Sequence, residues 1–307
     1  MLTTLAKRLD KLTRTGTLYE TLEEDVVRCY ACAHRCLIRE GRRGICKVRF
    51  NQGGELKVPW GYVSSIQVDP IEKKPFYHFM AGEDALTFGM LGCNFHCSYC
   101  QNWLTSQTLQ DPAADRSGSY IRQVSSGDIV RYGEKNWAAV VASSYNEPLI
   151  TSEWAHEIFS KAVKVGMRPV YVSNGHATPE VLAYLAPYLQ GFKVDLKSMQ
   201  EEHYRESGGK LQHVLDSIQL AHEIGMWVEV VTLVVPEYND SVEELMEIAR
   251  FVASVSPNIP WHVSAFYPTY KMTSRPRTPV DLLRKAAKIG QEGGIRYVYT
   301  GNRPGQV

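Results

Sequence analysis

The sequence lacks a long apolar run and has almost no net charge. No stretch approaches the roughly 20 apolar residues of a membrane-spanning helix. The first residues, MLTTLAKRLDKLTRTG, carry scattered charges and lack the apolar centre of a signal peptide. Lys and Arg number 34 and Asp and Glu number 33, so composition indicates no polyanion-binding surface. We therefore expect a cytoplasmic protein, with no membrane partner and no nucleic-acid partner indicated.

The sequence also lacks internal repeats, low-complexity tracts and several common catalytic templates. His156-Glu157 is followed by Ser160 at the position where a zincin needs its second histidine. Gly208-Gly209-Lys210 is followed by Leu211 instead of the Ser or Thr of a phosphate-binding loop. No G-x-S-x-G occurs either, so hydrolase and NTPase hypotheses have no support.

What the chain does contain is seven cysteines in two dense groups. A disulfide framework would usually spread them along the chain, and their number would be even. In a cytoplasmic protein, clustered thiols favour metal binding.

The turn content and the hydrophobic pattern of the sequence change near residue 85. Residues 1–84 are rich in turns and contain the first cysteine group, which predicts a small irregular leading domain. Residues 85–307 alternate short β-rich apolar runs with helical patterns, which is typical of βα units around a parallel sheet. The expected strands are Ala85–Leu91, Ala138–Ser143, Arg168–Ser173, Gly191–Leu196, Trp227–Val235, Trp261–Tyr267 and Arg296–Thr300. The expected helices are Ser152–Val165, Glu180–Leu189, Lys210–Ile224, Val242–Ser254 and Val280–Glu292.

This succession predicts an α/β fold with a partial or complete parallel barrel. Pro179, Asp240-Ser241 and Pro279 stand where three of the helices should begin. In parallel barrels the functional side chains gather at the carboxyl ends of the strands. The residues that follow each expected strand are therefore the candidates for a site.

A cysteine triplet follows the first expected strand. Cys93, Cys97 and Cys100 have the spacing C-x3-C-x2-C. A [4Fe–4S] cluster normally needs four ligands, so three thiolates would leave one iron free to bind a small molecule. The alternatives are a structural zinc loop completed by His96 or a distant residue, and three buried free thiols. The position after a strand, at the functional end of a barrel, favours the cluster.

The run GMLGCNFHCSYCQNW around the triplet, with DPIEKKP upstream, resembles the AmmeMemoRadiSam-system radical S-adenosylmethionine (SAM) enzymes, which are similar to pyruvate formate-lyase activating enzyme. The similarity extends from the first cysteine group to Tyr299-Thr300-Gly301-Asn302. It implies a partial (β/α)6-type TIM barrel of the radical SAM kind. It also implies that SAM chelates the unique iron of the cluster, and that one electron cleaves SAM to methionine and a 5′-deoxyadenosyl radical that abstracts hydrogen from a substrate. A low-potential electron donor of the flavodoxin or ferredoxin type would be needed, and Tyr99 would contact SAM.

The second expected strand is followed by Asn146 and Glu147. A carboxylate there could accept charge-assisted hydrogen bonds from the α-ammonium group of SAM. The resemblance implies this role, because family members carry a GGE-like segment at this place. The alternative is that Asn146 and Glu147, which precede Pro148, cap a helix.

The third and fourth expected strands end in Asn174 and in Asp195-Leu196-Lys197. Strand alternation places Asp195 and Lys197 on one face, with Lys193 if the strand is regular. The resemblance implies that Lys197 contacts the SAM carboxylate, that Asp195 acts in the same neighbourhood and that Asn174 belongs to the SAM site. The alternative is a structural ion pair. Related activases carry an aspartate where this chain has Asn174, which argues against a bound monovalent cation.

The sixth expected strand contains His262, which resembles the histidine near the ribose and carboxylate of SAM in activating enzymes. A lone histidine in an apolar strand is more often a satisfied core residue, which is the alternative for His262. Glu229 and Thr232 on the fifth strand alternate to opposite faces, so only one of them can point inward.

The leading group, Cys29, Cys32, Cys36 and Cys46, has the spacing C-x2-C-x3-C-x9-C. Four such ligands suit a tetrahedral zinc site or an auxiliary iron–sulfur cluster, with zinc slightly favoured. His34 is an alternative ligand or a bystander, and unligated thiols are the remaining possibility.

Three hypotheses follow for the whole chain. The first is a radical SAM enzyme that acts on a small molecule, since no peptide-docking module is evident. The second is a glycyl-radical activase that modifies a partner protein. The third is a non-catalytic zinc-binding interaction protein, which would need both cysteine groups to be structural.

Overall fold

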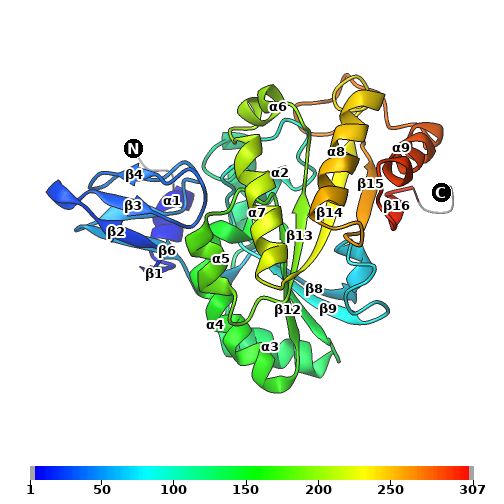
Figure 1. Cartoon of the computed structure of the whole chain (residues 1–307). Helices are drawn as coiled ribbons and strands as arrows, with labels where there is room; N and C mark the ends of the chain where they lie inside the picture. Colours follow the sequence, from blue (N-terminus) through cyan, green and yellow to red (C-terminus); the bar gives the residue numbers. More distant parts are fainter. Residues whose placement is uncertain (1–3, 304–307) are drawn as a thin grey trace.

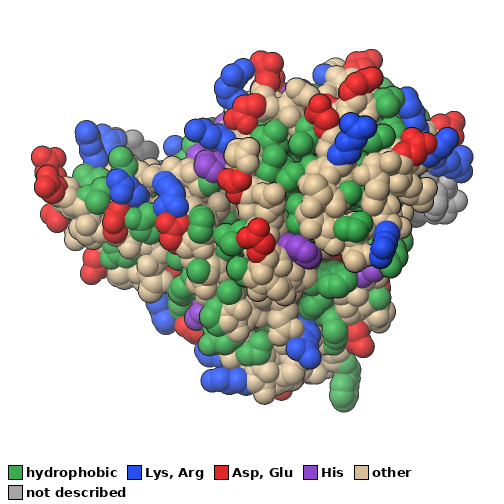
Figure 2. Space-filling model, viewed as in Figure 1, with side chains coloured by type: hydrophobic (Ala, Val, Ile, Leu, Met, Phe, Trp, Pro, Cys, Tyr) green, Lys and Arg blue, Asp and Glu red, His purple; other side chains and the backbone are tan. Residues whose placement is uncertain are grey.

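The computed structural model describes residues 4–303, with the side chains of Ser117 and Ser119 left aside. A twisted sheet of eight strands, surrounded by helices, forms the larger part of the molecule, and a small β-rich module lies at one side (Figure 1). On the face in Figure 2, acidic and basic side chains are interspersed, in keeping with the near-zero net charge.

The main sheet has the order β16-β15-β14-β13-β12-β11-β9-β8. Its strands are β8 (Ser65–Pro70), β9 (Asp84–Gly89), β11 (Val140–Ser143), β12 (Arg168–Ser173), β13 (Gly191–Asp195), β14 (Trp227–Val234), β15 (Trp261–Ala265) and β16 (Val298–Gly301). All neighbours pair in parallel except β8, which runs antiparallel to β9. The seven expected strands are thus confirmed, and they form a partial barrel.

Helices connect the parallel strands. They are α3 (Ser126–Lys135), α4 (Ser152–Ala162), α5 (Pro179–Leu185), α6 (Glu201–Glu206), α7 (Leu211–Glu223), α8 (Val242–Val255) and α9 (Val280–Glu292), with the short α2 (Trp103–Ser106) after the cysteine triplet. The predicted helix starts are confirmed. Thr178 caps α5 with Pro179 in its first turn, Ser241 caps α8, and Pro279 is the N-cap residue of α9.

The small module contains short antiparallel strands. β1 (Thr13–Thr15), β6 (Glu55–Pro59) and β5 (Phe50–Gln52) form one sheet, and β2 (Tyr19–Thr21), β3 (Val27–Cys29) and β4 (Leu37–Ile38) form another. The helix α1 (Thr4–Asp10) precedes them, and β7 (Tyr62–Val63) pairs with β10 (Arg122–Gln123). β8 falls within residues 1–84 but belongs to the main sheet, so the expected leading segment contributes a strand to the barrel.

The segment after β8 fills the lower part of the barrel. Phe76 is fully buried and packs with Ile71 against Ala85, Val140 and Val170 of three strands. Beyond it, the backbone N–H groups of Tyr77 and His78 donate to the carboxylate of Glu229 on β14 at 3.0–3.1 Å. The ring of His78 also bonds the hydroxyl of Tyr299 on β16 at 2.7 Å. This segment therefore bridges the two edges of the open sheet.

Candidate active site

The cysteine triplet lies in the loop that follows β9, at the carboxyl ends of the parallel strands. Gly92 begins this loop with a φ of +98°. A Cβ atom on Gly92 would lie 2.9 Å from Cγ1 of Val48, inside van der Waals contact. Glycine is required here because the backbone has a left-handed conformation and approaches the small module closely.

All three cysteines line one small cavity of about 110 Å³. The same cavity is lined by five residues expected to contact SAM, namely Asn146, Glu147, Asn174, Asp195 and Lys197. A larger cavity of about 740 Å³ shares Cys97, Cys100, Asp195 and Lys197 with the first, and it adds Tyr99 and His262. The structure thus gathers every candidate residue of the triplet and the strand ends around two adjoining cavities.

The donor set of the triplet fits an iron–sulfur cluster. Burial raises the pKa of Cys93 well above its ordinary value and raises the pKa of Cys100 to about 11. Iron would replace these thiol protons, because coordination deprotonates a thiol. Among residues 4–303, no three Cys, His, Asp or Glu side chains converge on a position for a single metal ion. A cubane does not need that convergence, since each thiolate binds its own iron atom.

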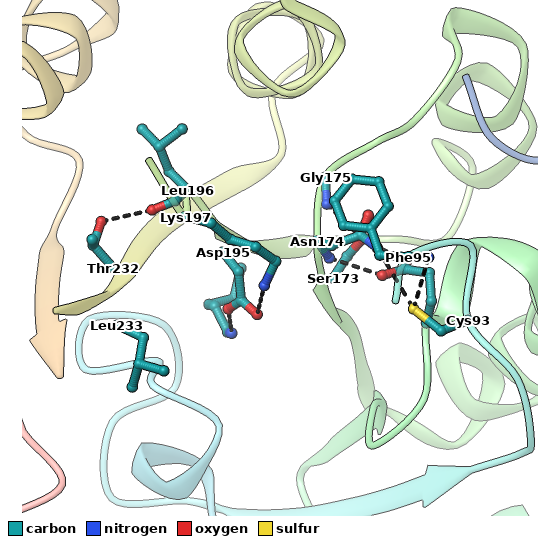
Figure 3. A network of polar contacts seen from close by, with 12 residues as sticks. Cys93, Phe95, Ser173, Asn174, Gly175, Asp195, Leu196, Lys197, Thr232 and Leu233 are labelled. Carbon is teal, nitrogen blue, oxygen red and sulfur yellow. Dashed lines mark hydrogen bonds and ion pairs between the residues drawn. The ribbon is translucent and has the colours of Figure 1, made fainter. Parts of the chain in front are cut away.

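A polar network ties the triplet loop to the end of β12 (Figure 3) and, through Glu147, to the end of β11. The backbone N–H of Phe95 donates to Sγ of Cys93 at 3.3 Å. The side-chain amide of Asn174 donates to Oδ1 of Asn94 at 2.7 Å and lies 3.9 Å from Sγ of Cys93. The backbone N–H of Asn174 in turn donates to Glu147 at 2.8 Å. Asn174 therefore links the loop to the strand ends.

Glu147 is buried and serves as the cap that sequence analysis left open as an alternative. Its carboxylate accepts from the N–H of Leu149 at 3.1 Å and from the hydroxyl of Ser173 at 2.7 Å, in addition to Asn174. Burial raises the pKa of Glu147 to about 7 although these donors lower it. Asn146 is similarly engaged, since its Oδ1 accepts from the N–H of Met90 at 2.9 Å.

Asp195 ends β13 and lies between two lysines, Lys193 within the strand and Lys197 just after it. Its carboxylate bonds the ammonium group of Lys193, and the ammonium group of Lys197 lies 3.3 Å away (Figure 3). Burial alone would raise the pKa of Asp195, but the two ammonium groups lower it to about 2. The ion pair considered as an alternative is therefore present, and it includes Lys193.

His262 is buried and bonds Glu229 at 2.7 Å through Nε2. The ring of Tyr77 meets the His262 ring edge-on, with 4.7 Å between centroids. Of the two residues on the fifth strand, Glu229 is the one that points inward, while the hydroxyl of Thr232 donates to the carbonyl of Leu196. His262 thus lines the larger cavity and also anchors the segment that bridges the sheet.

The residues of the larger cavity that were not predicted as site residues include Tyr145 and Lys74. Tyr145 has a φ of +70°, and the N–H of Asn146 donates to the carbonyl of Ser144 at 2.9 Å, which makes Tyr145 the centre of a γ-turn. The ammonium group of Lys74 lies 2.9 Å from Asp69 and 3.4 Å from the Tyr145 hydroxyl. A tyrosine gives no sequence signal for positive φ, and only the DPIEKKP run pointed to Lys74.

The leading cysteine group lies in the small module. Cys29 ends β3, Cys32 and Cys36 lie in the loop between β3 and β4, and Cys46 precedes β5. All seven cysteines are free thiols. The ring of His34 lies with Nδ1 3.6 Å from Sγ of Cys32 and Nε2 2.6 Å from the carbonyl of Gly208.

Relatives support this account of the fold. An uncharacterised protein of Methanocaldococcus jannaschii, MJ0808, is 35% identical over 294 residues, covering 95% of this chain and 86% of the relative. SuiB of Streptococcus suis is similar in structure, with 14% identity and a TM-score of 0.53, covering 70% of this chain and 48% of SuiB. A radical SAM methyltransferase of Sphaerobacter thermophilus gives 14% identity and a TM-score of 0.53, covering 73% of this chain and 67% of the methyltransferase.

The narrower AmmeMemoRadiSam grouping stays a prediction. In residues 4–303 there is no helix of the length and apolarity that crossing a membrane requires.

The sequence pattern of the Radical SAM superfamily matches residues 88–252, more than half of the chain, and this range contains the triplet and the ends of β9, β11, β12 and β13. Enzymes of this superfamily use a [4Fe–4S] cluster, SAM and a reductant, and the chain belongs to the radical SAM superfamily.

Proposed function

We propose that Cys93, Cys97 and Cys100 hold the [4Fe–4S] cluster and that the chain uses it to cleave SAM and abstract hydrogen from a small-molecule substrate. The observation that carries this proposal is the shared lining of one cavity by the three thiols, Asp195 and Lys197. When bound, the cluster supplies one electron to SAM and yields a 5′-deoxyadenosyl radical. The residues of the chain bind, orient and shield the reactants. A flavodoxin-type or ferredoxin-type protein is our proposed electron donor.

Lys197 is the group we assign to the SAM carboxylate. Its ammonium group is largely buried, and the charge of Asp195 raises its pKa against the effect of burial, so it stays protonated. Since Asp195 is shared with Lys193, Lys197 is only partly neutralised. A buried cation that is only partly neutralised is suited to form a charge-assisted hydrogen bond with a carboxylate.

Few protein groups are left to accept hydrogen bonds from the amino group of SAM. Glu147 already accepts three hydrogen bonds, which leaves about one of the roughly four lone-pair positions of a carboxylate. We assign that position to the SAM ammonium, with Asn146 and Asn174 holding Glu147 and the triplet loop in place. Tyr99 and His262 line the larger cavity, where we place the adenosine.

The size of the larger cavity favours a small-molecule substrate. Its volume of about 740 Å³ falls within the range of small-ligand sites, roughly 300–1,000 Å³. The part of the wall formed by Asp69, Glu72, Lys74 and Tyr145 lies outside the residues assigned to SAM. We propose that the substrate contacts this wall. Superfamily membership also favours an enzyme over a non-catalytic interaction protein.

The test is anaerobic reconstitution with iron and sulfide, followed by electron paramagnetic resonance (EPR) of the reduced protein with and without SAM. We expect a reduced [4Fe–4S] signal that changes when SAM is added, since SAM would bind the iron without a cysteine. Cys97→Ala should lose the signal. Ser98→Ala, in the same loop, is the matched control and should keep it. A cluster signal that does not change when SAM is added, or one that remains in Cys97→Ala, would contradict the assignment.

A further inference from the structure

The leading cysteine group carries a second inference, independent of the radical chemistry. The backbone N–H of Ile45, which directly precedes Cys46, donates to Sγ of Cys36 at 3.5 Å and so ties these two cysteines together. A hydrogen bond of this kind stabilises a thiolate more than a thiol, because it favours the charged form.

The four side chains are also close neighbours. The N–H of Cys29 donates to the carbonyl of Cys36 at 3.0 Å, which joins the two ends of the loop that holds Cys32. Cys29, Cys32 and Cys46 are 4–6% exposed. Cys36 is partly exposed, so three of the four cysteines are enclosed in a module whose own strands are only two to five residues long.

A buried guanidinium lies beside this group. Arg49 is 1% exposed, and its Nη atoms bond Glu153 and the carbonyl of Ile150. Its Nε has no hydrogen-bond partner among residues 4–303. Arg49 lies three residues after Cys46, and its carbonyl accepts from the N–H of Gly44 at 2.9 Å. The guanidinium is paired with Glu153, but its Nε–H is buried without an acceptor, which is costly unless a negatively charged group lies near it.

We propose that Cys29, Cys32, Cys36 and Cys46 bind one structural Zn²⁺ ion. Structural zinc sites are closed, tetrahedral and filled by four protein ligands, and a set of four cysteines, three of them buried, supplies that number of ligands. Zinc with four thiolates carries two net negative charges, which the Arg49 guanidinium partly offsets. Because no single-ion geometry is closed as the described side chains lie, at least one cysteine rotates about χ1 when the ion binds.

The zinc loop supports the back of the triplet loop. The N–H of Ala33 donates to the carbonyl of His176 at 3.0 Å, and His34 donates through Nε2 to the carbonyl of Gly208, since a carbonyl can only accept. The ring of His34 meets Phe95 edge-on, with 6.4 Å between centroids. Phe95 is the residue whose N–H bonds Cys93. The zinc ion therefore acts as a positioning element for the cluster loop, through His34 and Phe95.

The test measures metals by mass spectrometry in protein purified without reconstitution. The starting protein carries Cys93→Ala, Cys97→Ala and Cys100→Ala, so the result does not depend on the triplet cluster. We expect about one zinc per chain, and its loss when Cys29→Ser and Cys46→Ser are added. Cobalt in place of zinc should give the ligand-field absorption of a tetrahedral thiolate site.

Two outcomes would overturn the proposal. One is iron and sulfide, with absorption near 400 nm, bound after anaerobic reconstitution of the protein without the triplet, which would mean an auxiliary cluster. The other is folded protein that holds no zinc. Should the serine variants fail to fold, a mercurial reagent added to the starting protein decides the matter, because it must release one zinc as the four thiols react.

Discussion

At the residue scale, the account depends most on Lys197. Lys197→Met removes the ammonium group but keeps the side-chain length, so the cluster should still assemble. Loss of one charge-assisted hydrogen bond costs about 1.5–3 kcal/mol. We therefore expect SAM binding to weaken by a factor on the order of 10–100, measured by equilibrium dialysis on reconstituted protein. Lys271→Met, an exposed lysine beyond the triplet loop, is the control. Equal SAM affinity in both variants would remove Lys197 from the site.

His176 predicts a pH dependence of stability. It is buried beside His34, His213 and Lys210, and burial and then these positive neighbours lower its pKa to about 3. The unfolded chain takes up the proton below a pH of about 6.5, while the folded chain does not until about 3. The unfolded state binds more protons between these values, so stability falls as pH falls.

From pH 7 to 5 we expect this histidine to reduce the free energy of unfolding by on the order of 1–2 kcal/mol. His176→Gln retains an acceptor for the N–H of Lys210, which bonds Nε2 at 3.3 Å. Urea denaturation at both pH values should show a smaller loss in this variant. The exposed His222→Gln should behave as the unaltered protein. An unchanged pH slope in His176→Gln would mean that another group carries the effect.

The residues of the site were largely predictable from sequence, but their contacts were not. The spacing of Cys93, Cys97 and Cys100 and the position of Asp195 after a strand gave their location directly. Glu147 has a second role as a helix cap, and Tyr145 lies in a γ-turn. The cap was one of two alternatives that the sequence offered for Glu147, whereas the residue type of Tyr145 gives no indication of a positive φ.

At the scale of elements, the segment that bridges the sheet should depend on Glu229. Its carboxylate accepts from the N–H groups of Tyr77 and His78, from the indole of Trp227 and from His262. In Glu229→Gln, the side-chain amide places an N–H donor where a carboxylate oxygen accepted hydrogen bonds from these groups. We expect the free energy of unfolding to fall by about 2–4 kcal/mol, since a buried charged acceptor is lost.

Chemical denaturation of Glu229→Gln measures this effect. Glu83→Gln is the matched control, since Glu83 is exposed in the same connection between β8 and β9. Equal stability of the two variants would show that the bridging segment is held by Phe76 and its apolar contacts alone.

The elements were predicted well where apolar runs were long. The seven parallel strands and five helices match the structure within a few residues at each end. The elements that were not foreseen include α3 and β8. The helix α3 contains Gly127 and Gly133, which lower helix propensity. Gly133 is needed there, since a Cβ would lie 2.6 Å from Cε of Met167. The strand β8 ends at Pro70 and lies in a segment whose sequence is rich in turns.

At the scale of the whole molecule, one buried ion pair joins the small module to the barrel. Arg49 reaches Glu153 on α4 with both Nη atoms, at 2.8 and 2.5 Å, and both side chains are buried. Arg49→Met leaves the carboxylate buried and unpaired. We expect a loss of about 3–5 kcal/mol in the free energy of unfolding.

A second ion pair between the same two parts is the control. Arg35 and Glu180 lie 2.7 Å apart, and their side chains are 41% and 43% exposed. Arg35→Met should cost no more than about 1 kcal/mol. Thermal or urea denaturation compares the two variants, and similar losses would mean that burial of the Arg49 pair does not matter.

The whole-molecule arrangement was the least predictable. Sequence placed a cysteine-rich segment before a barrel, but it did not show that His34 and Phe95 bring the two cysteine groups into one neighbourhood. That contact joins residues far apart in sequence, and only the packing of the small module on the loops after β9 and β12 creates it.

The central claim is that this chain cleaves SAM at the cysteine triplet. The most direct measurement is the amount of 5′-deoxyadenosine formed by reconstituted protein with dithionite and SAM, compared with Cys93→Ala and with Ser98→Ala. The account predicts product from the unaltered protein and from Ser98→Ala, and none from Cys93→Ala. Product that persists undiminished in Cys93→Ala would contradict it.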